Sequence, residues 1–280
     1  MSVAEETVIG RSPPAARLGD MPGRLAVAVP GAALVVAALA IGGELFAGAL
    51  AVVAAVAAFE GARLLRASRV DSAAVGAASG AVVVAAALGG LDALPGALAA
   101  AFGVLAVASI LRMPATGRVV PVAAGSLCVL WIGGGLAHGV LLRELEHGGA
   151  LVLAVLLGTF VGDTAAHIVG SLFGRRRLAP GISPLKTIEG LAAGIVVGTG
   201  SVVALALIAE PWLGAGEAAI LGLAVSLGAP CGDLWESAVK REAGAKDSAR
   251  LLGPHGGMLD RVDALLFTVP LGYYVSTGLL

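Results

Sequence analysis

Long stretches without a single charged residue constrain the fold of this sequence more than any other feature. Nine such runs occur, at 25–43, 45–59, 72–91, 93–111, 119–142, 147–162, 190–209, 218–232 and 264–280. A helix of about 20 residues crosses the ~30 Å hydrocarbon layer of a bilayer. Strands of a membrane barrel would alternate apolar and polar residues, whereas these runs are apolar on all sides. The sequence therefore predicts an all-α polytopic membrane protein.

The charged fraction excludes the main alternatives to a membrane protein. Only 13% of the residues are charged and 58% are hydrophobic, whereas soluble domains carry about 25% charged residues. So little polar surface does not cover so much apolar surface in water. This balance argues against a soluble globular protein, a disordered chain and a nucleic-acid binder.

We expect about nine transmembrane helices separated by connectors rich in Gly and Pro. Their expected ranges are 25–41, 45–61, 72–90, 95–112, 119–142, 149–173, 190–209, 216–238 and 262–278. The chain then divides into an N-terminal tail, helices one to five, and a C-terminal region with most of the ionisable residues. These three parts cover residues 1–24, 25–148 and 149–280.

The distribution of basic residues predicts the orientation in the membrane. All 18 Lys and Arg residues except Arg143 fall in the tail or in alternate connectors on one side. Lys and Arg collect on the cytoplasmic side of membrane proteins. We therefore expect a cytoplasmic N-terminus and tail and an external C-terminus.

Acidic residues inside predicted helices are the main indication of function, because charge is costly in a bilayer. Asp163 lies in the cytoplasmic half of the sixth helix, where it could also be protonated or paired with an Arg. In the eighth helix Asp233, Glu236, Ser237 and Lys240 share one face. An ion pair between Glu236 and Lys240 is the simpler interpretation of that face.

Asp260 and Asp263 begin the ninth helix at the same predicted depth as Asp233. Carboxylates in such positions cap helices, but clustered carboxylates also bind Mg²⁺ together with substrate phosphates. The preceding loop carries five basic residues and a Gly-Pro-His-Gly-Gly turn, which suit a polyphosphate. The connector after the sixth helix adds Lys186, and Ser183 or Thr187 could cap the seventh helix.

The segment from Ser237 to Asp263 resembles the signature of the phosphatidate cytidylyltransferase (CDP-diacylglycerol synthase) family. The family pattern is roughly S-x-apolar-K-R-x4-K-D, a spacer, and H-G-G-apolar-x-D-R-apolar-D, and this segment fills it. Residues 162–164 and 182–190 resemble a second block of the family. The resemblance covers about residues 158–280.

The resemblance implies an enzyme of the bacterial inner (plasma) membrane that converts CTP and phosphatidate to CDP-diacylglycerol and diphosphate, a step of phospholipid biosynthesis. It implies an active site on the cytoplasmic side and Mg²⁺ with a second cation. The sequence leaves the oligomeric state open, and a homodimer is one expectation. The implied catalytic residues, with CTP-phosphate contacts among them, are Lys240, Arg241, Lys246, Asp247, His255 and Arg261. The implied metal ligands are Asp233, Asp260 and Asp263. The implied substrate-binding residues are Asp163, Ser183, Lys186, Thr187 and Ser237.

Two other functions stay open at the level of sequence. A CTP-dependent polyprenol or phytol kinase would use the same nucleotide in the same setting but would release CDP. A non-enzymatic cation transporter would explain the buried acids, although it would leave the basic loop and its glycine turn without a role.

Overall fold

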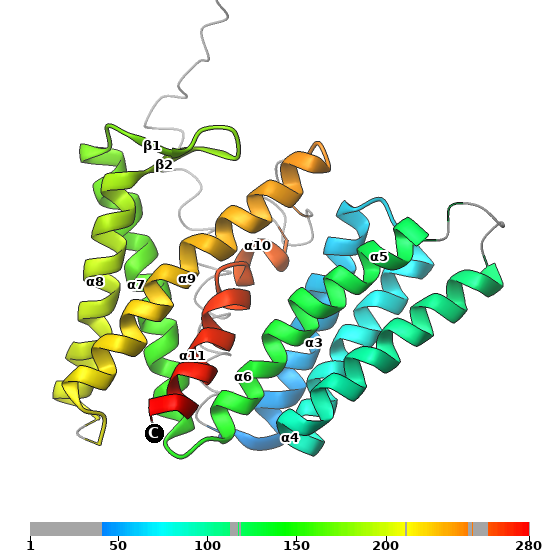
Figure 1. Cartoon of the computed structure of the whole chain (residues 1–280), viewed down its shortest axis with the longest axis horizontal. Helices are drawn as coiled ribbons and strands as arrows, with labels where there is room; N and C mark the ends of the chain where they lie inside the picture. The colour runs from blue at the N-terminus through cyan, green and yellow to red at the C-terminus, as the bar shows by residue number, and fades with distance from the viewer. Residues whose placement is uncertain are drawn as a thin grey trace, which may run out of the picture. The chain divides into compact units, whose positions relative to one another are not determined.

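The computed structural model describes residues 41–112, 117, 119–210, 212–245, 248 and 257–279, and nearly all of them are helical (Figure 1). The expected tail 1–24 and the expected first helix, 25–41, lie outside this range except for Ile41. The division of the chain at residues 24 and 148 stays a prediction.

The first described part is a group of helices around α3, which spans Gly43–Leu64. It packs against α4, Arg69–Arg112. The sequence predicts two helices and a connector within α4, but the structure joins two helical arms directly at Gly90. The φ of Gly90 is 63°, a left-handed conformation that residues with a Cβ rarely adopt. The break therefore needs no loop.

A third long helix of this part contains an irregular segment. It begins as α5, Val119–Cys128, and ends as α6, Gly135–Glu144. Between them η1, Val129–Gly134, is a π-helix. One wider turn of this kind shifts the faces of the flanking helical segments relative to each other.

The second part begins with a pair of long helices that pack against each other, α7 (Gly148–Phe173) and α8 (Ile188–Ile208). They pack closely along a seam of glycines. A Cβ on Gly162 would lie 3.1 Å from the carbonyl oxygen of Gly194, and one on Gly198 would lie 2.8 Å from that of Gly158. The two backbones therefore touch directly, as small-xxx-small spacing allows.

The connector between α7 and α8 contains a hairpin that the sequence did not predict. Strand β1, Arg177–Ala179, pairs antiparallel with β2, Ser183–Thr187. The expectation of a purely helical chain is thus wrong at this point. Thr187 ends the hairpin and begins α8, because its side chain accepts a hydrogen bond from the N–H of Gly190.

The last helices pack across the first two groups. Helix α9, Ala215–Glu242, contacts α7, α8 and α11, Leu265–Leu279. In Figure 1, α9 runs obliquely across the α7–α8 pair, and α11 lies between that pair and α6. The sequence predicts one helix over 262–278, but the structure has a short α10, Leu259–Val262, and a turn before α11. The carboxylate of Asp263 accepts a hydrogen bond from the N–H of Ala264 in that turn, at 2.8 Å.

Six helical stretches among the described residues are long and apolar enough to cross a membrane, and α4 counts once among them. They are Gly43–Leu64, Arg69–Arg112, Val119–Glu144, Gly148–Phe173, Ile188–Ile208 and Ala215–Glu242. The polytopic, nearly all-helical architecture is therefore confirmed. A total of nine spans and the orientation of the termini stay predictions.

Candidate active site

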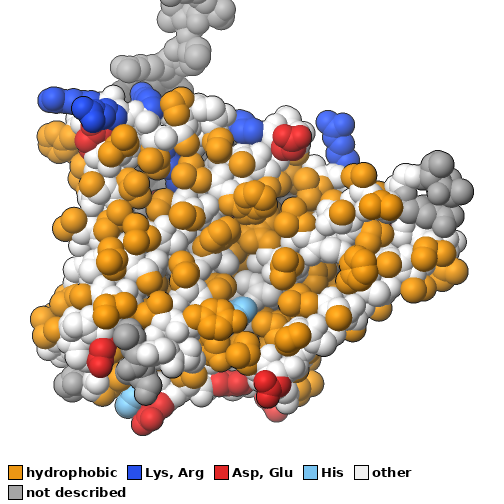
Figure 2. All heavy atoms as spheres, viewed as in Figure 1, with side chains coloured by type: hydrophobic (Ala, Val, Ile, Leu, Met, Phe, Trp, Pro, Cys, Tyr) orange, Lys and Arg blue, Asp and Glu red, His pale blue; other side chains and the backbone are white. Residues whose placement is uncertain are grey.

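Charged side chains from separate elements meet at one end of the described bundle. We call the following set the charged cluster: Asp163 of α7, Lys186 of β2, Asp233, Glu236 and Lys240 of α9, Asp260 of α10, and Asp263 of the turn after it. Figure 2 shows Lys and Arg side chains gathered at the end that carries β1 and β2, together with some acidic side chains, whereas the charged side chains visible at the opposite end are acidic or His.

Lys240 is the centre of one half of the charged cluster. Its Nζ donates to Glu236 Oε2 at 2.6 Å and to Asp260 Oδ1 at 2.9 Å. The side chain of Glu236 is 1% exposed and that of Lys240 is 15% exposed. The sequence-level ion pair between Glu236 and Lys240 is present, and the structure extends it to Asp260. Little of the charge of Lys240 is screened by solvent.

Asp260 is held by donors from several directions. Its carboxylate accepts from the backbone N–H of Gly257 at 2.7 Å and from the hydroxyl of Ser248 at 2.9 Å. Burial favours the neutral acid, but hydrogen bonds, among them those from the N–H of Gly257 and the ammonium group of Lys240, outweigh it and lower the pKa of Asp260 to about 2. Asp260 therefore stays ionised and is already fully engaged.

Asp233 is the centre of the other half of the charged cluster. Its Oδ2 lies 2.5 Å from Lys186 Nζ, and its Oδ1 accepts from the hydroxyl of Ser237 at 3.4 Å. Asp163 and Asp263 both lie within electrostatic range of Asp233 and Lys186. The close approach of α9 to the turn at Asp263 depends on Gly232, where a Cβ would lie 2.5 Å from the carbonyl oxygen of Asp263.

The three predicted metal ligands have different hydrogen-bond partners. Within the described part of the chain, no three carboxylate, His or Cys side chains come together as a metal site. Asp263 lies within electrostatic range of Asp233, whereas Asp260 accepts hydrogen bonds from Lys240 and Ser248. Two carboxylates suffice for Mg²⁺ when substrate phosphates supply other ligands, and the metal role of Asp233, Asp260 and Asp263 stays a prediction.

The hairpin brings the predicted substrate-binding residues to this end of the bundle. Lys186 reaches Asp233, and Arg241 donates from Nε to the carbonyl oxygen of Ile182 at 3.3 Å. Thr187 ends β2, is buried and caps α8, and Ser183 begins the same strand. The structure therefore gives Thr187 the capping role that the sequence left open, while substrate contacts of all four residues stay predictions.

Three predicted catalytic residues, Lys246, Asp247 and His255, lie outside the described residues. Arg261 is described, lies on α10 and is exposed.

Glu60 is a residue of this site that sequence analysis missed. It lies near the C-terminal end of α3, is 2% exposed, and accepts from the backbone N–H of Leu259 at 2.9 Å. The available signal was a lone acid that interrupts an otherwise apolar predicted helix, which by itself suggests function.

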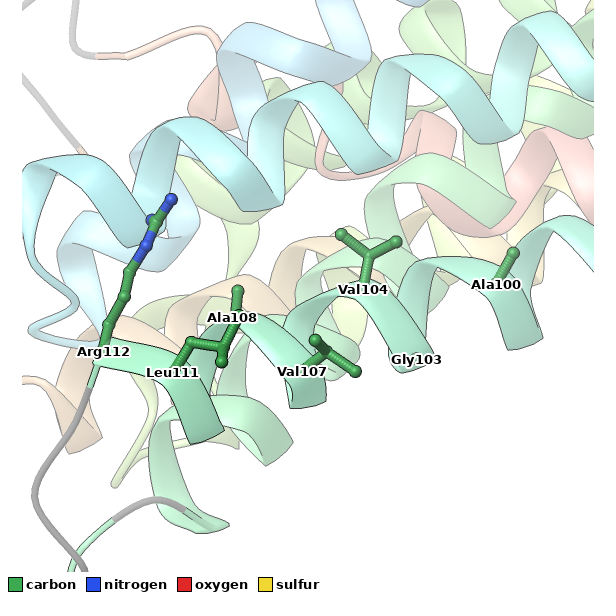
Figure 3. A pocket seen from close by; sticks show the side chains of 7 residues that line it. All are labelled: Ala100, Gly103, Val104, Val107, Ala108, Leu111 and Arg112. Carbon is green, nitrogen blue, oxygen red and sulfur yellow. The ribbon is translucent and has the colours of Figure 1, made fainter.

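A groove on the outer arm of α4 lies apart from this chemistry (Figure 3). Its lining residues all come from α4: Ala100, Gly103, Val104, Val107, Ala108, Leu111 and Arg112. No member of the charged cluster lines it, and its surface suits contact with apolar chains.

Comparisons with known proteins agree with the chemistry of this end. The model of the cytidylyltransferase family matches residues 22–278. The chain is 35% identical over 159 residues to the phosphatidate cytidylyltransferase of Mycobacterium bovis, covering 56% of this chain and 51% of that protein. It is 34% identical over 151 residues to the phosphatidate cytidylyltransferase of Bacillus subtilis, covering 54% and 56%.

A further relative carries no assigned activity in its name. The uncharacterized protein YnbB of Escherichia coli is 40% identical over 134 residues, which cover 47% of this chain and 44% of that protein. The chain spans about half the length of the curated relatives it matches.

Proposed function

The chain belongs to the cytidylyltransferase family, and on that premise we propose that it is a phosphatidate cytidylyltransferase. It would convert CTP and phosphatidate to CDP-diacylglycerol and diphosphate. The observation that carries this proposal is the meeting of Lys186 and Lys240 with the carboxylates of Asp233 and Asp260 at the basic end of the bundle. The names of the curated relatives support it.

The reaction needs charge stabilisation more than it needs a protein nucleophile. A phosphate oxygen of phosphatidate attacks the α-phosphorus of CTP, the new P–O bond forms, and the bond to the diphosphate leaving group breaks. Catalysis of such a transfer consists mainly of positioning and electrostatic stabilisation. Lys186, Lys240 and Arg241 would neutralise the phosphates of the two substrates.

The charged cluster also suggests how the resting site keeps its charges paired. Lys186 forms a salt bridge with Asp233, and Lys240 forms salt bridges with both Glu236 and Asp260. We propose that Asp233 and Asp263 hold Mg²⁺ when CTP is present, and that Lys186 then turns to a substrate phosphate. A bound Mg²⁺ would supply charge neutralisation for the triphosphate. A second cation and a homodimer belong to the same proposal.

The membrane setting explains how a lipid substrate reaches this end. We propose nine spans in the inner (plasma) membrane, with the charged cluster on the cytoplasmic side, and the gathering of basic side chains at that end supports this. Reporter fusions at residues 68, 115, 178 and 247 should read as cytoplasmic, and fusions at 92, 145 and 213 as external. A cytoplasmic C-terminal fusion would contradict the topology.

Product analysis with purified protein tests the proposed reaction. The full chain in detergent, given CTP, phosphatidate and Mg²⁺, should release diphosphate and form a CDP-lipid in equal amounts. Release of CDP instead, with a polyprenol or phytol acceptor, would identify a lipid kinase. Cation flux in vesicles without consumption of CTP would identify a transporter.

A further inference from the structure

Helix α3 contains a buried acid, Glu60, which is unexpected in a helix that is otherwise apolar. Its other acid, Glu44, is exposed in the first turn, whereas Glu60 is 2% exposed near the other end. Burying a carboxylate costs free energy unless donors compensate it. The position of Glu60 therefore requires a reason.

The donors that meet Glu60 come from the segment that begins α10. Its Oε2 accepts from the N–H of Leu259 at 2.9 Å. Leu259 is the first residue of α10, so its N–H has no acceptor within that helix. Met258 and Ser248 also face the carboxylate. Glu60 thus connects α3 to the start of α10, which lies 199 residues later in the chain.

Gly257 leaves the space in which this contact forms. A Cβ at this position would collide with Glu60 Oε2 and with Ser248 Oγ. Gly257 also donates its N–H to Asp260 at 2.7 Å. The glycine of the predicted turn therefore lies between the two carboxylates, and a side chain there would push Glu60 away from α10.

Packing alone does not explain why a carboxylate lies at position 60. Glu60 Oε1 is buried and has no hydrogen-bond partner among the described residues. Replacing a buried ionic group by an apolar side chain of similar volume is often neutral or stabilising. Neighbouring apolar packing is already present, since Leu259 is fully buried and its side chain would lie 3.6 Å from a Cβ at Gly61.

We propose that Glu60 is a positioning residue for the active site, an inference that rests on the proposed function. It holds the first turn of α10 by the N–H of Leu259, and so places Asp260 against Lys240 and Asp263 beside Asp233. Glu60 touches neither substrate in this role. The helices before residue 145 thereby contribute to the chemistry of the second part through one carboxylate.

Kinetics of three variants test the role of Glu60 in turnover. Glu60→Met fills the volume without an acceptor and should lower kcat about 10- to 100-fold, the usual effect of removing a group that orients the reacting residues. KM for CTP should change less than about threefold, because the phosphate contacts are retained. Glu60→Gln keeps an acceptor of the same length and should restore kcat to within about threefold of wild type. Glu44→Gln, on the exposed end of α3, is the matched control.

Hydrogen exchange tests the contact itself without any reaction. Peptides that cover residues 257–263 should exchange faster in Glu60→Met than in wild type, whereas Glu60→Gln should keep their protection. Unchanged exchange in Glu60→Met would overturn the proposal. If Glu60→Met does not fold, Gly257→Ala is the second variant, and normal exchange and kcat there would overturn it equally.

The two kinds of failure are distinguishable. If wild type makes no CDP-lipid, the proposed function fails and the exchange experiment still decides the contact. If wild type is active and folded Glu60→Met has the same kcat, the proposed function stands and the positioning role is wrong.

Discussion

The helices before residue 145 and those after it are similarly apolar but differ in the charged side chains that they contain. In the described first part, Glu60 is the buried acid, and its partners lie in the second part. In the second part, the charged cluster consists of buried or half-buried charges except for the exposed Asp163. The difference shows that the first part is more than a membrane anchor, since it places one polar group where the second part needs an acceptor.

The largest effect should come from removing divalent cations, and it should act on the second part alone. Exhaustive chelation should abolish formation of CDP-lipid, and added Mg²⁺ should restore it, because Asp233 and Asp263 would otherwise repel the triphosphate. Diphosphate release is the measurement. The thermal midpoint of the unliganded protein should stay the same, and full activity after chelation would contradict the metal role.

Lys240→Met should cause the next largest effect, this time on stability. It leaves Glu236 and Asp260 without their cation, and removal of one partner from a buried pair costs about 3–5 kcal/mol. The thermal midpoint in detergent measures the loss. Adding Glu236→Leu should recover part of the stability but none of the activity. The control in the first part is Arg63→Met, an exposed site, which should stay within about 0.5 kcal/mol.

Asp263→Asn should lower activity at nearly constant stability. We expect a loss of about 100-fold or more, the effect of removing one strong electrostatic group at a reacting centre. Asn is nearly isosteric and retains an oxygen that can accept from Ala264. Specific activity and thermal midpoint are measured on the same preparation. Glu144→Gln in the first part should be silent, and a folded, fully active Asp263→Asn protein would exclude Asp263 as a ligand.

Two helix caps give the smallest effect and sharpen the comparison between the parts. Thr187 caps α8, and Ser68 accepts from the N–H of Asp71 at the start of α4. Thr187→Val and Ser68→Ala should each cost about 1 kcal/mol of stability. Only Thr187→Val should also raise KM, because Thr187 adjoins Lys186. Equal kinetics in both variants would remove Thr187 from the substrate side.

Much of the fold was predictable because apolar runs and glycine connectors act locally. Most helical stretches from residue 45 onward follow the predicted ranges within a few residues, although no connector follows the break at Gly90 and the last helix is divided into α10 and α11. The hairpin β1–β2 was not predictable, because its strands of three and five residues show no alternation of apolar and polar side chains. Its two chain ends are instead held by Glu189, whose carboxylate accepts from the N–H groups of Arg175 and Arg176.

The candidate site was predictable only in part, for a different physical reason. Helical spacing places Asp233, Glu236 and Lys240 on one face, and the structure has the resulting ion pair. Spacing within one helix gives no information on partners from other elements. The bonds from Lys186 to Asp233 and from Leu259 to Glu60 therefore appear only in three dimensions.

The glycine seam between α7 and α8 has a mechanical consequence. Where backbone atoms are in direct contact, no side chain remains that could change rotamer and let one helix slide on the other. The pair should therefore move as one stiff rod. Strand β2 continues into α8 without a linker at Thr187, so Lys186 lies directly at the N-terminal end of α8. A rigid-body movement of the α7–α8 pair would therefore move the ammonium group of Lys186 with it.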